Sequence, residues 1–433
     1  MFNFLKKRKK NKNEEVVAQD QKNNGTENQF APKFGSSQDF MDAYMKNGVH
    51  VVIGHDGENE VGVSIIDPPG DTMFVVNDNF DSVLNQCVAP TVLQEKLSYV
   101  IYDPEGKYSE SLGTKMRLRG YDVMVVDFAD PENKSRLDLF EIANITRNPY
   151  WLSVILSGSI KCEKNEIAIA HNLFMSAMQY LLAEKGKLTV EDFCDVCQKI
   201  VAIDVDVLRA VRECSTSKDY IEELAKYDMD ILRAAYDKIS NRLLAGMTLK
   251  AKNPNVFTVM AHKKQNVIFV RRVPKEYRYL MTVMLFNLKT SNVVCGYGDV
   301  STLIIDTANE KWYNKAMLKK VTDEAGAIMD RSVGMMTIRG AIDDEAKANN
   351  NQILIYMHSD DVATREHVFG YLRVGGHQFT HTDTKEKGIN VLEDAMNAAP
   401  IPFEELDKLT ANIVIDTSGA VKPFMCDRLK VNG

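Results

Sequence analysis

The chain lacks several features that would assign it at once to a class of proteins. It has no run of about 18 apolar residues, so a transmembrane helix is not expected. The first residues, "MFNFLKKRKKNKN", contain too short an apolar part for a signal peptide. Seven cysteines in 433 residues show no spacing of a disulfide framework. Together these absences predict a cytoplasmic protein with reduced thiols.

An excess of positive charge is also missing. The formal net charge is -7, which argues against a surface dominated by nucleic-acid contacts. The composition is 45% hydrophobic and 26% charged, as in ordinary globular proteins. The length fits two or three domains, or one large domain with insertions.

The first 32 residues are poor in apolar side chains and rich in Lys, Asn, Gln and Glu, so we predict a disordered basic tail. Within residues 2–12, Phe2, Phe4 and Leu5 precede five consecutive basic residues. Such a segment is suited to an anionic membrane, where each basic residue contributes roughly 1 kcal/mol. Contact with nucleic acid and a merely solubilising role are the alternatives.

From about residue 48, short apolar runs alternate with helical stretches. Nine runs are predicted as strands: "VHVVIG", "TMFVVN", "LSYVIYD", "YDVMVVDF", "QNVIFVRRV", "VSTLIID", "SVGMMTI", "NQILIYM" and "ANIVIDT". Most are continuous rather than alternating, which is typical of strands covered on both faces. The order predicts an α/β fold with a mostly parallel sheet.

The region from about 150 to 255 contains no convincing strand. Thr189 ahead of Glu191 and Asp192 is a helix-start signal, and the stretch "DMDILRAAYDKISNRLLAGM" has a helical apolar face. We therefore predict an all-α domain at 187–250, inserted between two parts of the α/β domain at 33–186 and 251–433.

Nucleotide hydrolysis is the commonest chemistry of such a sheet, but its phosphate loop is absent. The motif G-x-x-x-x-G-K-[ST] occurs nowhere, and the loop after the strand "TMFVV" carries Asp78 and Asp81 instead. Each carboxylate would repel a phosphate by about 1 kcal/mol even in high dielectric. The strand "STLIID" ends in Asp306, in the position of a magnesium ligand, but Thr307 follows where a hydrolytic carboxylate is expected.

Other candidate sites are weaker. No cluster predicts a metal site, and Cys194 and Cys197 are interpreted as core thiols rather than ligands. One basic group after a strand is a candidate DNA-binding surface: Arg271, Arg272, Lys275 and Arg278.

The segment "YVIYDPEGKYSESLGTKMRLRGYDVMVVDFADPENKSRLDLFEI" resembles the VirD4/TraG-type coupling proteins of conjugation and type IV secretion. The likeness rests on a strand that ends in an Asp-Pro turn, a helix that runs to Arg-Gly-Tyr, and a second Asp-Pro segment. The matching residues are Asp103, Pro104, Glu105, Gly106, Lys107, Arg119, Gly120, Tyr121, Asp130 and Pro131. The order of segments extends the resemblance over most of the chain.

This resemblance implies a P-loop NTPase-like fold of the RecA/FtsK type with an inserted all-α domain. If Pro90 matches the proline after the family's phosphate loop, the Gly-Lys-Ser/Thr positions fall on Ser82, Val83 and Leu84. The hydrolytic acid becomes Thr307, and the sensor glutamine becomes Arg339. Three elements of one nucleotide site are thus altered. We expect neither ATP nor magnesium to be bound, and no catalytic residue is assigned.

The resemblance implies a component of conjugative DNA transfer or type IV secretion. We expect a non-hydrolysing scaffold that recruits a relaxase, accessory or substrate proteins through its helical domain, in a ring that contains an active coupling ATPase. We expect it in the cytoplasm, at the inner face of the membrane. An active DNA-translocating ATPase that uses ATP and magnesium in an unorthodox site is the first alternative. An unrelated α/β protein is the second.

Overall fold

The computed structural model describes most of the chain. The described ranges are 34–45, 50–64, 72–94, 97–129, 139–158, 164–234, 236–237, 266–295, 302–307, 311–326, 333–348, 352–373, 401–418 and 422–429. The predicted basic tail, residues 1–32, therefore lies outside the described residues. None of the helices within these ranges combines the length and the apolar character that crossing a membrane would require.

One sheet organises the described chain, with eleven strands in the order β2-β1-β11-β10-β9-β3-β8-β7-β4-β6-β5. The strands are β1 (His50–Asp56), β2 (Asn59–Ser64), β3 (Thr72–Val76), β4 (Ser98–Tyr102), β5 (Asp122–Asp127), β6 (Asn266–Arg271), β7 (Thr302–Asp306), β8 (Val333–Arg339), β9 (Ile353–Tyr356), β10 (Ala411–Asp416) and β11 (Phe424–Asp427). All pairs from β9 to β5 are parallel, and the pairs from β9 to β2 are antiparallel.

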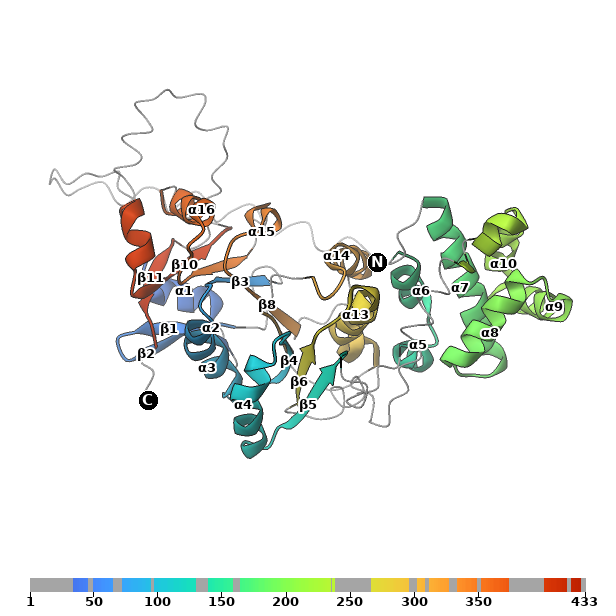
Figure 1. The fold of residues 1–433 in the computed structure, drawn as a ribbon, viewed down its shortest axis with the longest axis horizontal. Coiled ribbons are helices and arrows are strands. Elements are labelled where there is room, and N and C mark those ends of the chain that lie inside the picture. Colours follow the sequence, from blue (N-terminus) through green and yellow to red (C-terminus); the bar gives the residue numbers. More distant parts are fainter. Residues whose placement is uncertain are drawn as a thin grey trace, which may run out of the picture.

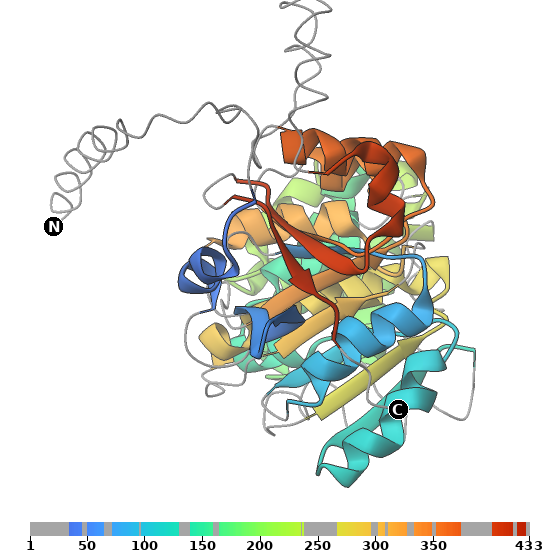
Figure 2. The ribbon, with the colours of Figure 1, turned by 90° about the vertical axis from the view of Figure 1, so that its left-hand side faces the viewer.

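Helices cover both faces of this sheet, which explains the continuous apolar runs. Along β4, Tyr99 and Ile101 enter one hydrophobic cluster and Val100 and Tyr102 enter another. The helices and turns that accompany the sheet are α1 (Ser37–Tyr44), α2 (Phe80–Val83), α3 (Ala89–Val92), α4 (Lys107–Leu118), η2 (Lys275–Tyr277), α13 (Arg278–Cys295), α14 (Lys315–Ala325), α15 (Asp344–Ala348), α16 (Val362–Arg373) and η4 (Phe403–Lys408). Figure 2 shows the sheet between these helices, with α4 on one side and α16 on the other.

A lobe of helices stands at one end of the molecule (Figure 1). It consists of α5 (Glu141–Thr146), α6 (Tyr150–Gly158), α7 (Lys164–Glu184), α8 (Val190–Val201), α9 (Val205–Glu213) and α10 (Lys218–Leu224). No strand occurs in the described residues between 139 and 237, as the sequence predicts. The predicted insertion at 187–250 covers only α8 to α10 of this lobe, and its end lies outside the described residues.

The lobe is not separate from the sheet. One hydrophobic cluster joins Leu173 and Phe174 of α7 to Leu285 of α13 and to Ile268 of β6. Tyr102 at the end of β4 stacks on Trp312 in the same cluster, with ring centroids 4.8 Å apart and planes only 4° from parallel. The core of the sheet therefore continues into the helices that carry the lobe.

All nine predicted strands are present, and the fold class is confirmed as a mostly parallel α/β sheet. Two strands, β2 and β11, were not among the predicted runs. Both lie in the antiparallel part of the sheet, where β11 alternates between buried and exposed side chains. Half-exposed antiparallel strands lack the continuous apolar run by which buried strands are recognised.

Candidate functional site

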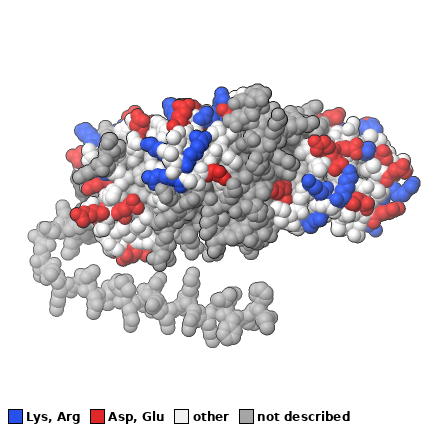
Figure 3. Space-filling model, turned by 90° about the horizontal axis from the view of Figure 1, so that it is seen from below, with Lys and Arg blue, Asp and Glu red and all other residues white. Residues whose placement is uncertain are grey.

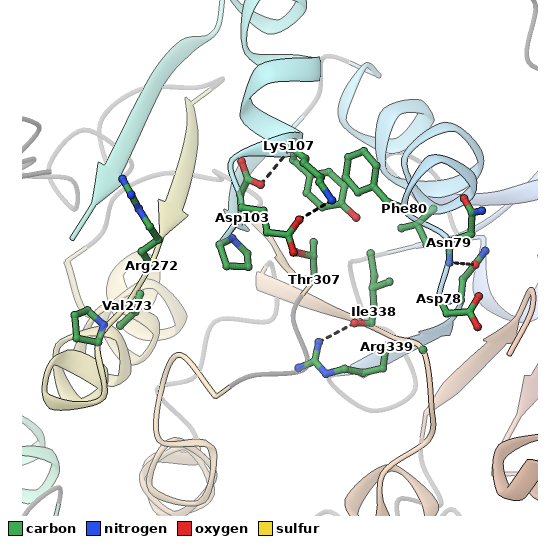
Figure 4. Close-up of a pocket in the computed structure, with 17 residues that line it drawn as sticks. Asp78, Asn79, Phe80, Asp103, Lys107, Arg272, Val273, Thr307, Ile338 and Arg339 are labelled. Carbon is green, nitrogen blue, oxygen red and sulfur yellow. Dashed lines mark hydrogen bonds and ion pairs between the residues drawn. The ribbon is translucent and has the colours of Figure 1, made fainter. Parts of the chain in front are cut away.

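A cavity of about 870 Å³ opens at the carboxyl ends of β3, β4, β6, β7 and β8. This is the edge of an α/β sheet where ligands usually bind. Figure 4 shows side chains from all these strand ends around it. The lining residues are Asn77, Asp78, Asn79, Phe80, Val83, Asp103, Pro104, Glu105, Lys107, Tyr108, Arg272, Val273, Pro274, Thr307, Ile338, Arg339 and Gly340.

The loop that leaves β3 is too short to surround a phosphate. Only Asn77, Asp78 and Asn79 separate Val76 at the end of β3 from Phe80 at the start of α2. A phosphate loop needs several successive backbone N–H groups that point into an open concavity. Three residues give the backbone no room to form that concavity.

The two asparagines of this loop bind backbone N–H groups of the loop and of α2. Asn77 Oδ1 accepts a hydrogen bond from the Asn79 N–H at 2.8 Å, and Asn79 Oδ1 accepts one from the Ser82 N–H at 2.9 Å. The Asn77 N–H donates to the Arg339 carbonyl at 2.8 Å. Asn79 is thereby the N-cap of α2. Three N–H groups of the loop and of the first turn of α2 are thus already bonded inside the protein.

The three positions that the resemblance matched to Gly-Lys-Ser/Thr lie in the helical segment after this loop. Ser82 is half-buried, and its hydroxyl accepts a hydrogen bond from Asn77 Nδ2 at 2.9 Å. Val83 is buried and lines the cavity. Leu84 begins a π-helical turn (Leu84–Val88) and packs in the core instead. Pro90 lacks an N–H for the carbonyl four residues before it, which a π-turn at this point accommodates.

Asp306 and Arg339, from neighbouring strands, form a buried ion pair. Arg339 Nη2 lies 2.7 Å from Asp306 Oδ2, and the two side chains are only 15% and 4% exposed. Arg339 Nη1 also donates to the carbonyl of Asp306 at 3.0 Å and to that of Ile338 at 2.8 Å. Figure 4 shows this guanidinium folded against the end of β8. The carboxylate in the position expected of a magnesium ligand therefore has an arginine as its counter-ion.

Thr307, which follows Asp306, lines the cavity, and its hydroxyl donates to the Tyr102 carbonyl. A threonine hydroxyl held in this way offers no carboxylate to activate water. Asp306, Thr307 and Arg339 thus lie together at the ends of β7 and β8, while Leu84 does not join them.

The four basic residues proposed for DNA binding divide into two pairs. Arg272 binds the buried Asp127 carboxylate through two nitrogens, with Nε 2.9 Å from Oδ1. Arg271 donates to the Gly106 carbonyl at 3.2 Å and to the Ser109 hydroxyl. Lys275 is exposed and Arg278 is half-buried. The first two arginines are therefore occupied by contacts within the protein.

The pKa of Asp127 reflects its partner. Burial alone would raise this pKa, but hydrogen bonds from Arg272 and from the Ala129 N–H lower it below the ordinary value, and nearby Arg271 contributes in the same direction. The ionised carboxylate is thus stabilised in the folded chain. Arg272 adopts a left-handed backbone with φ of 49°, which a non-glycine residue rarely does.

Lys107 is the most accessible cation of the cavity. Its Nζ lies 2.6 Å from Glu105 Oε2 and 5.5 Å from the centre of the Phe80 ring. The hydrogen bond and the charge of Glu105 raise the pKa of Lys107, so it remains protonated. Phe80 in turn packs edge-on against Tyr108 at 4.8 Å. In the sequence, Lys107 was matched only as part of the Asp-Pro turn. Its position directly after Gly106, at the end of a strand, could have indicated a cation of the cavity.

The turn before Lys107, like the loop after β3, is held by hydrogen bonds between a side chain and backbone N–H groups. Asp103 caps α4 by accepting hydrogen bonds from the Tyr108 N–H at 3.1 Å and the Ser109 N–H at 2.8 Å. Gly106 has a φ of 82°, and a Cβ there would lie 2.8 Å from the Arg271 guanidinium. This turn needs glycine for its conformation and for its close approach to Arg271.

We expect Arg339→Met to destabilise the protein by about 3–5 kcal/mol, because it leaves the Asp306 carboxylate buried without its counter-ion. The double variant Asp306→Leu/Arg339→Met is the control, and it should recover most of that loss because no charge remains buried. Urea unfolding followed by circular dichroism measures both. A single variant as stable as the wild type would contradict the assigned role of the pair.

We expect Arg272→Gln to flatten the acid limb of the stability curve. A carboxyl whose folded pKa is lowered contributes stability above its unfolded pKa, about 3.9, and loses it as the pH falls through the folded pKa. The difference in melting temperature between wild type and Arg272→Gln should therefore be constant above about pH 5 and shrink towards pH 3. Lys275→Gln, at an exposed position nearby, is the control and should leave the curve unchanged. A difference that grows on acidification would contradict this assignment.

Comparisons with known proteins bear on the fold. No family model matches the chain, and no curated protein matches its sequence. Among solved structures, the conjugative coupling protein TrwBΔN70 with sulphate is similar, at 13% identity, TM-score 0.54 and 93% coverage of each chain. TrwB with an ATP analogue gives 13% identity and TM-score 0.53, covering 92% of this chain and 93% of that one.

TrwB with ADP and Mg²⁺ gives 11% identity and TM-score 0.52, covering 93% of this chain and 94% of that one. These likenesses extend over more than nine-tenths of both chains. The chain therefore has the P-loop NTPase-like α/β fold of the plasmid coupling proteins.

Proposed function

We propose that the chain is a non-hydrolysing, coupling-protein-like component of conjugative DNA transfer or type IV secretion. It recruits relaxase, accessory or substrate proteins in the cytoplasm. The fold supports the pathway, since the similar structures over more than nine-tenths of the chain are conjugative coupling proteins. The cavity at the carboxyl edge of the sheet supports the absence of hydrolysis.

The observation that carries the proposal is the ion pair between Asp306 and Arg339. A divalent ion beside Asp306 would meet a guanidinium 2.7 Å from one of the two carboxylate oxygens. Two cations compete for one carboxylate, and the arginine is covalently attached and held by two further carbonyls. The metal would have to displace it and leave a charge without a partner in a buried place.

The other groups of the cavity favour the same conclusion. A triphosphate requires cations and open N–H groups. Arg272 is bound to Asp127, Lys107 to Glu105, and the first turns of α2 and α4 to Asn79 and Asp103. Asp78 adds a carboxylate to the lining. Nucleotide binding would have to break several satisfied contacts, and each broken contact lowers the net affinity.

The helical lobe is the surface proposed for recruitment. Its outer helices α8 to α10 form the end of the molecule opposite the sheet (Figure 1). None of the described residues that line the cavity comes from α5 to α10. Three further predictions belong to this proposal. The chain joins a ring that includes an active ATPase, the exposed Lys275 contacts DNA, and residues 2–12 bind an anionic membrane.

We expect ATP and ADP to leave the stability of the chain unchanged. A ligand present at 100 times its Kd stabilises the folded state by about 2.7 kcal/mol, which a thermal melt detects. Melts with about 5 mM nucleotide and Mg²⁺ should match melts with Mg²⁺ alone, and calorimetry should show no saturable heat. A rise in Tm that needs Mg²⁺ and disappears in Asp306→Asn would favour the active ATPase instead.

Transfer assays separate a scaffold from an ATPase in the cell. A donor that lacks this chain should lose transfer, and Lys107→Met should restore it as fully as the wild type. Lys107 is the cation of the cavity that is not bound to a buried carboxylate, so an ATPase would need it for phosphate. Normal transfer without the chain would contradict the pathway, whereas failure of Lys107→Met alone would contradict only the absence of hydrolysis.

A further inference from the structure

The turn between α8 and α9, at the far end of the helical lobe, has an unusual side chain. Helix α8 ends in a Schellman motif: the Asp204 N–H donates to the Lys199 carbonyl at 3.0 Å, and the Ile203 N–H to the Ile200 carbonyl at 3.2 Å. The left-handed position of this motif normally belongs to glycine. Here it is Ile203, with φ of 60°. A β-branched residue in this conformation is a genuine outlier.

Nothing within the described lobe compensates for this strain. Ile203 is 45% exposed and belongs to none of the hydrophobic clusters. The apolar contact that often accompanies a Schellman motif is missing, because the next residue is Asp204. Val205, the first residue of α9, is 64% exposed beside it. The turn therefore presents two neighbouring β-branched side chains to the outside, one of them at an energetic disadvantage.

The helices around this turn are strongly acidic. Between Val190 and Leu224 there are nine Asp and Glu against four Lys and Arg, a net charge of −5, while the entire chain carries −7. Three of the four basic side chains lie within 4.0 Å of an acidic neighbour on their own helix. Figure 3 shows Asp and Glu gathered over this end of the molecule, with Lys and Arg among them. The surface is suited to a partner that is both basic and apolar.

One segment of this chain has that chemistry. Residues 1–12, "MFNFLKKRKKNK", contain six basic residues, no acidic residue, and an apolar group of Phe2, Phe4 and Leu5. The segment precedes Phe34, the first described residue, by 21 residues. Extended chain covers up to about 3.4 Å per residue, so this connection spans up to roughly 70 Å. Helix α1 and helix α9 lie at opposite ends of the long axis in Figure 1, which favours the tip of a neighbouring copy.

We propose that the tip formed by Ile203 and Val205 binds residues 1–12 of this chain, supplied by a neighbouring copy. The apolar residues cover the two exposed side chains, and the basic residues face the carboxylates of α8 to α10. The contact joins the start of one copy to the lobe of the next, as a head-to-tail assembly requires. The inference does not depend on whether the cavity binds a nucleotide.

A titration tests the contact directly. The probe is a fluorescent peptide of residues 1–12, added to the full-length chain whose own tail carries Lys6→Glu, Lys7→Glu, Arg8→Glu and Lys9→Glu, so that it does not compete. Anisotropy should show saturable binding that weakens as salt is raised. Val205→Ser should weaken it about fivefold to tenfold, because an apolar contact is lost.

The chain offers a matched control for that variant. Val362 is also the first residue of a helix, α16, and is 51% exposed. Val362→Ser should leave binding unchanged. Equal weakening by both serine variants, or peptide that binds anionic phosphatidylserine vesicles but not the protein, would overturn the proposal.

A second variant separates binding from folding. Ile203→Gly relieves the left-handed strain, so its melting temperature should equal or exceed that of the wild type, while peptide binding falls as in Val205→Ser. The unmodified chain should associate with rising concentration in sedimentation, and Ile203→Gly should not. A lower melting temperature with normal binding would show that Ile203 has only a structural role within the lobe.

Discussion

The site depends on a single buried contact, the ion pair between Asp306 and Arg339. Parallel strands bring their carboxyl ends to one edge of the sheet. Because β7 and β8 are neighbours there, the two side chains lie next to each other. A carboxylate that is 4% exposed needs a cation, because ionic burial without a partner costs several kcal/mol. In an enzyme of this architecture that cation is a metal that arrives with the substrate. In this chain it is part of the protein, so the edge is complete without a ligand.

Other polar groups around the cavity also have their partners within the protein. Asn77 and Asn79 each bind one N–H group at the start of α2, Asp103 binds two in the first turn of α4, and Arg272 binds Asp127. None of these contacts lies in the apolar clusters on the two faces of the sheet. The strands and their covering helices determine the fold, so polar side chains at the strand ends can change without disturbing it. That independence explains how a coupling-protein fold persists at 11–13% identity.

Sequence reasoning succeeded where burial is symmetrical. Strands such as β4 and β7 are buried throughout because helices cover both faces, and each has a continuous apolar run, whereas β11 alternates and was not predicted. The turn signal Asp56-Gly57 before β2 was available and was not used. The contacts within the site were harder to predict, because the order of the strands in the sheet cannot be read from the sequence. Arg271 and Arg272 looked like a basic surface, and only the neighbours of β6 in the sheet reveal that Asp103 and Asp127 bind them.

Ile203 differs from the other residues whose backbone is strained. Among the described residues, three that are not glycine have positive φ: Arg147, Ile203 and Arg272. Each such conformation costs roughly 1–2 kcal/mol. The two arginines obtain compensation inside the fold, since Arg147 donates to the Gly186 carbonyl and Arg272 binds a buried carboxylate. Ile203 has only its half-exposed side chain, which can gain free energy solely by being covered. The strain at Arg147 in the lobe and at Arg272 beside the cavity is thus explained within one copy, whereas the strain at Ile203 points outward to a partner.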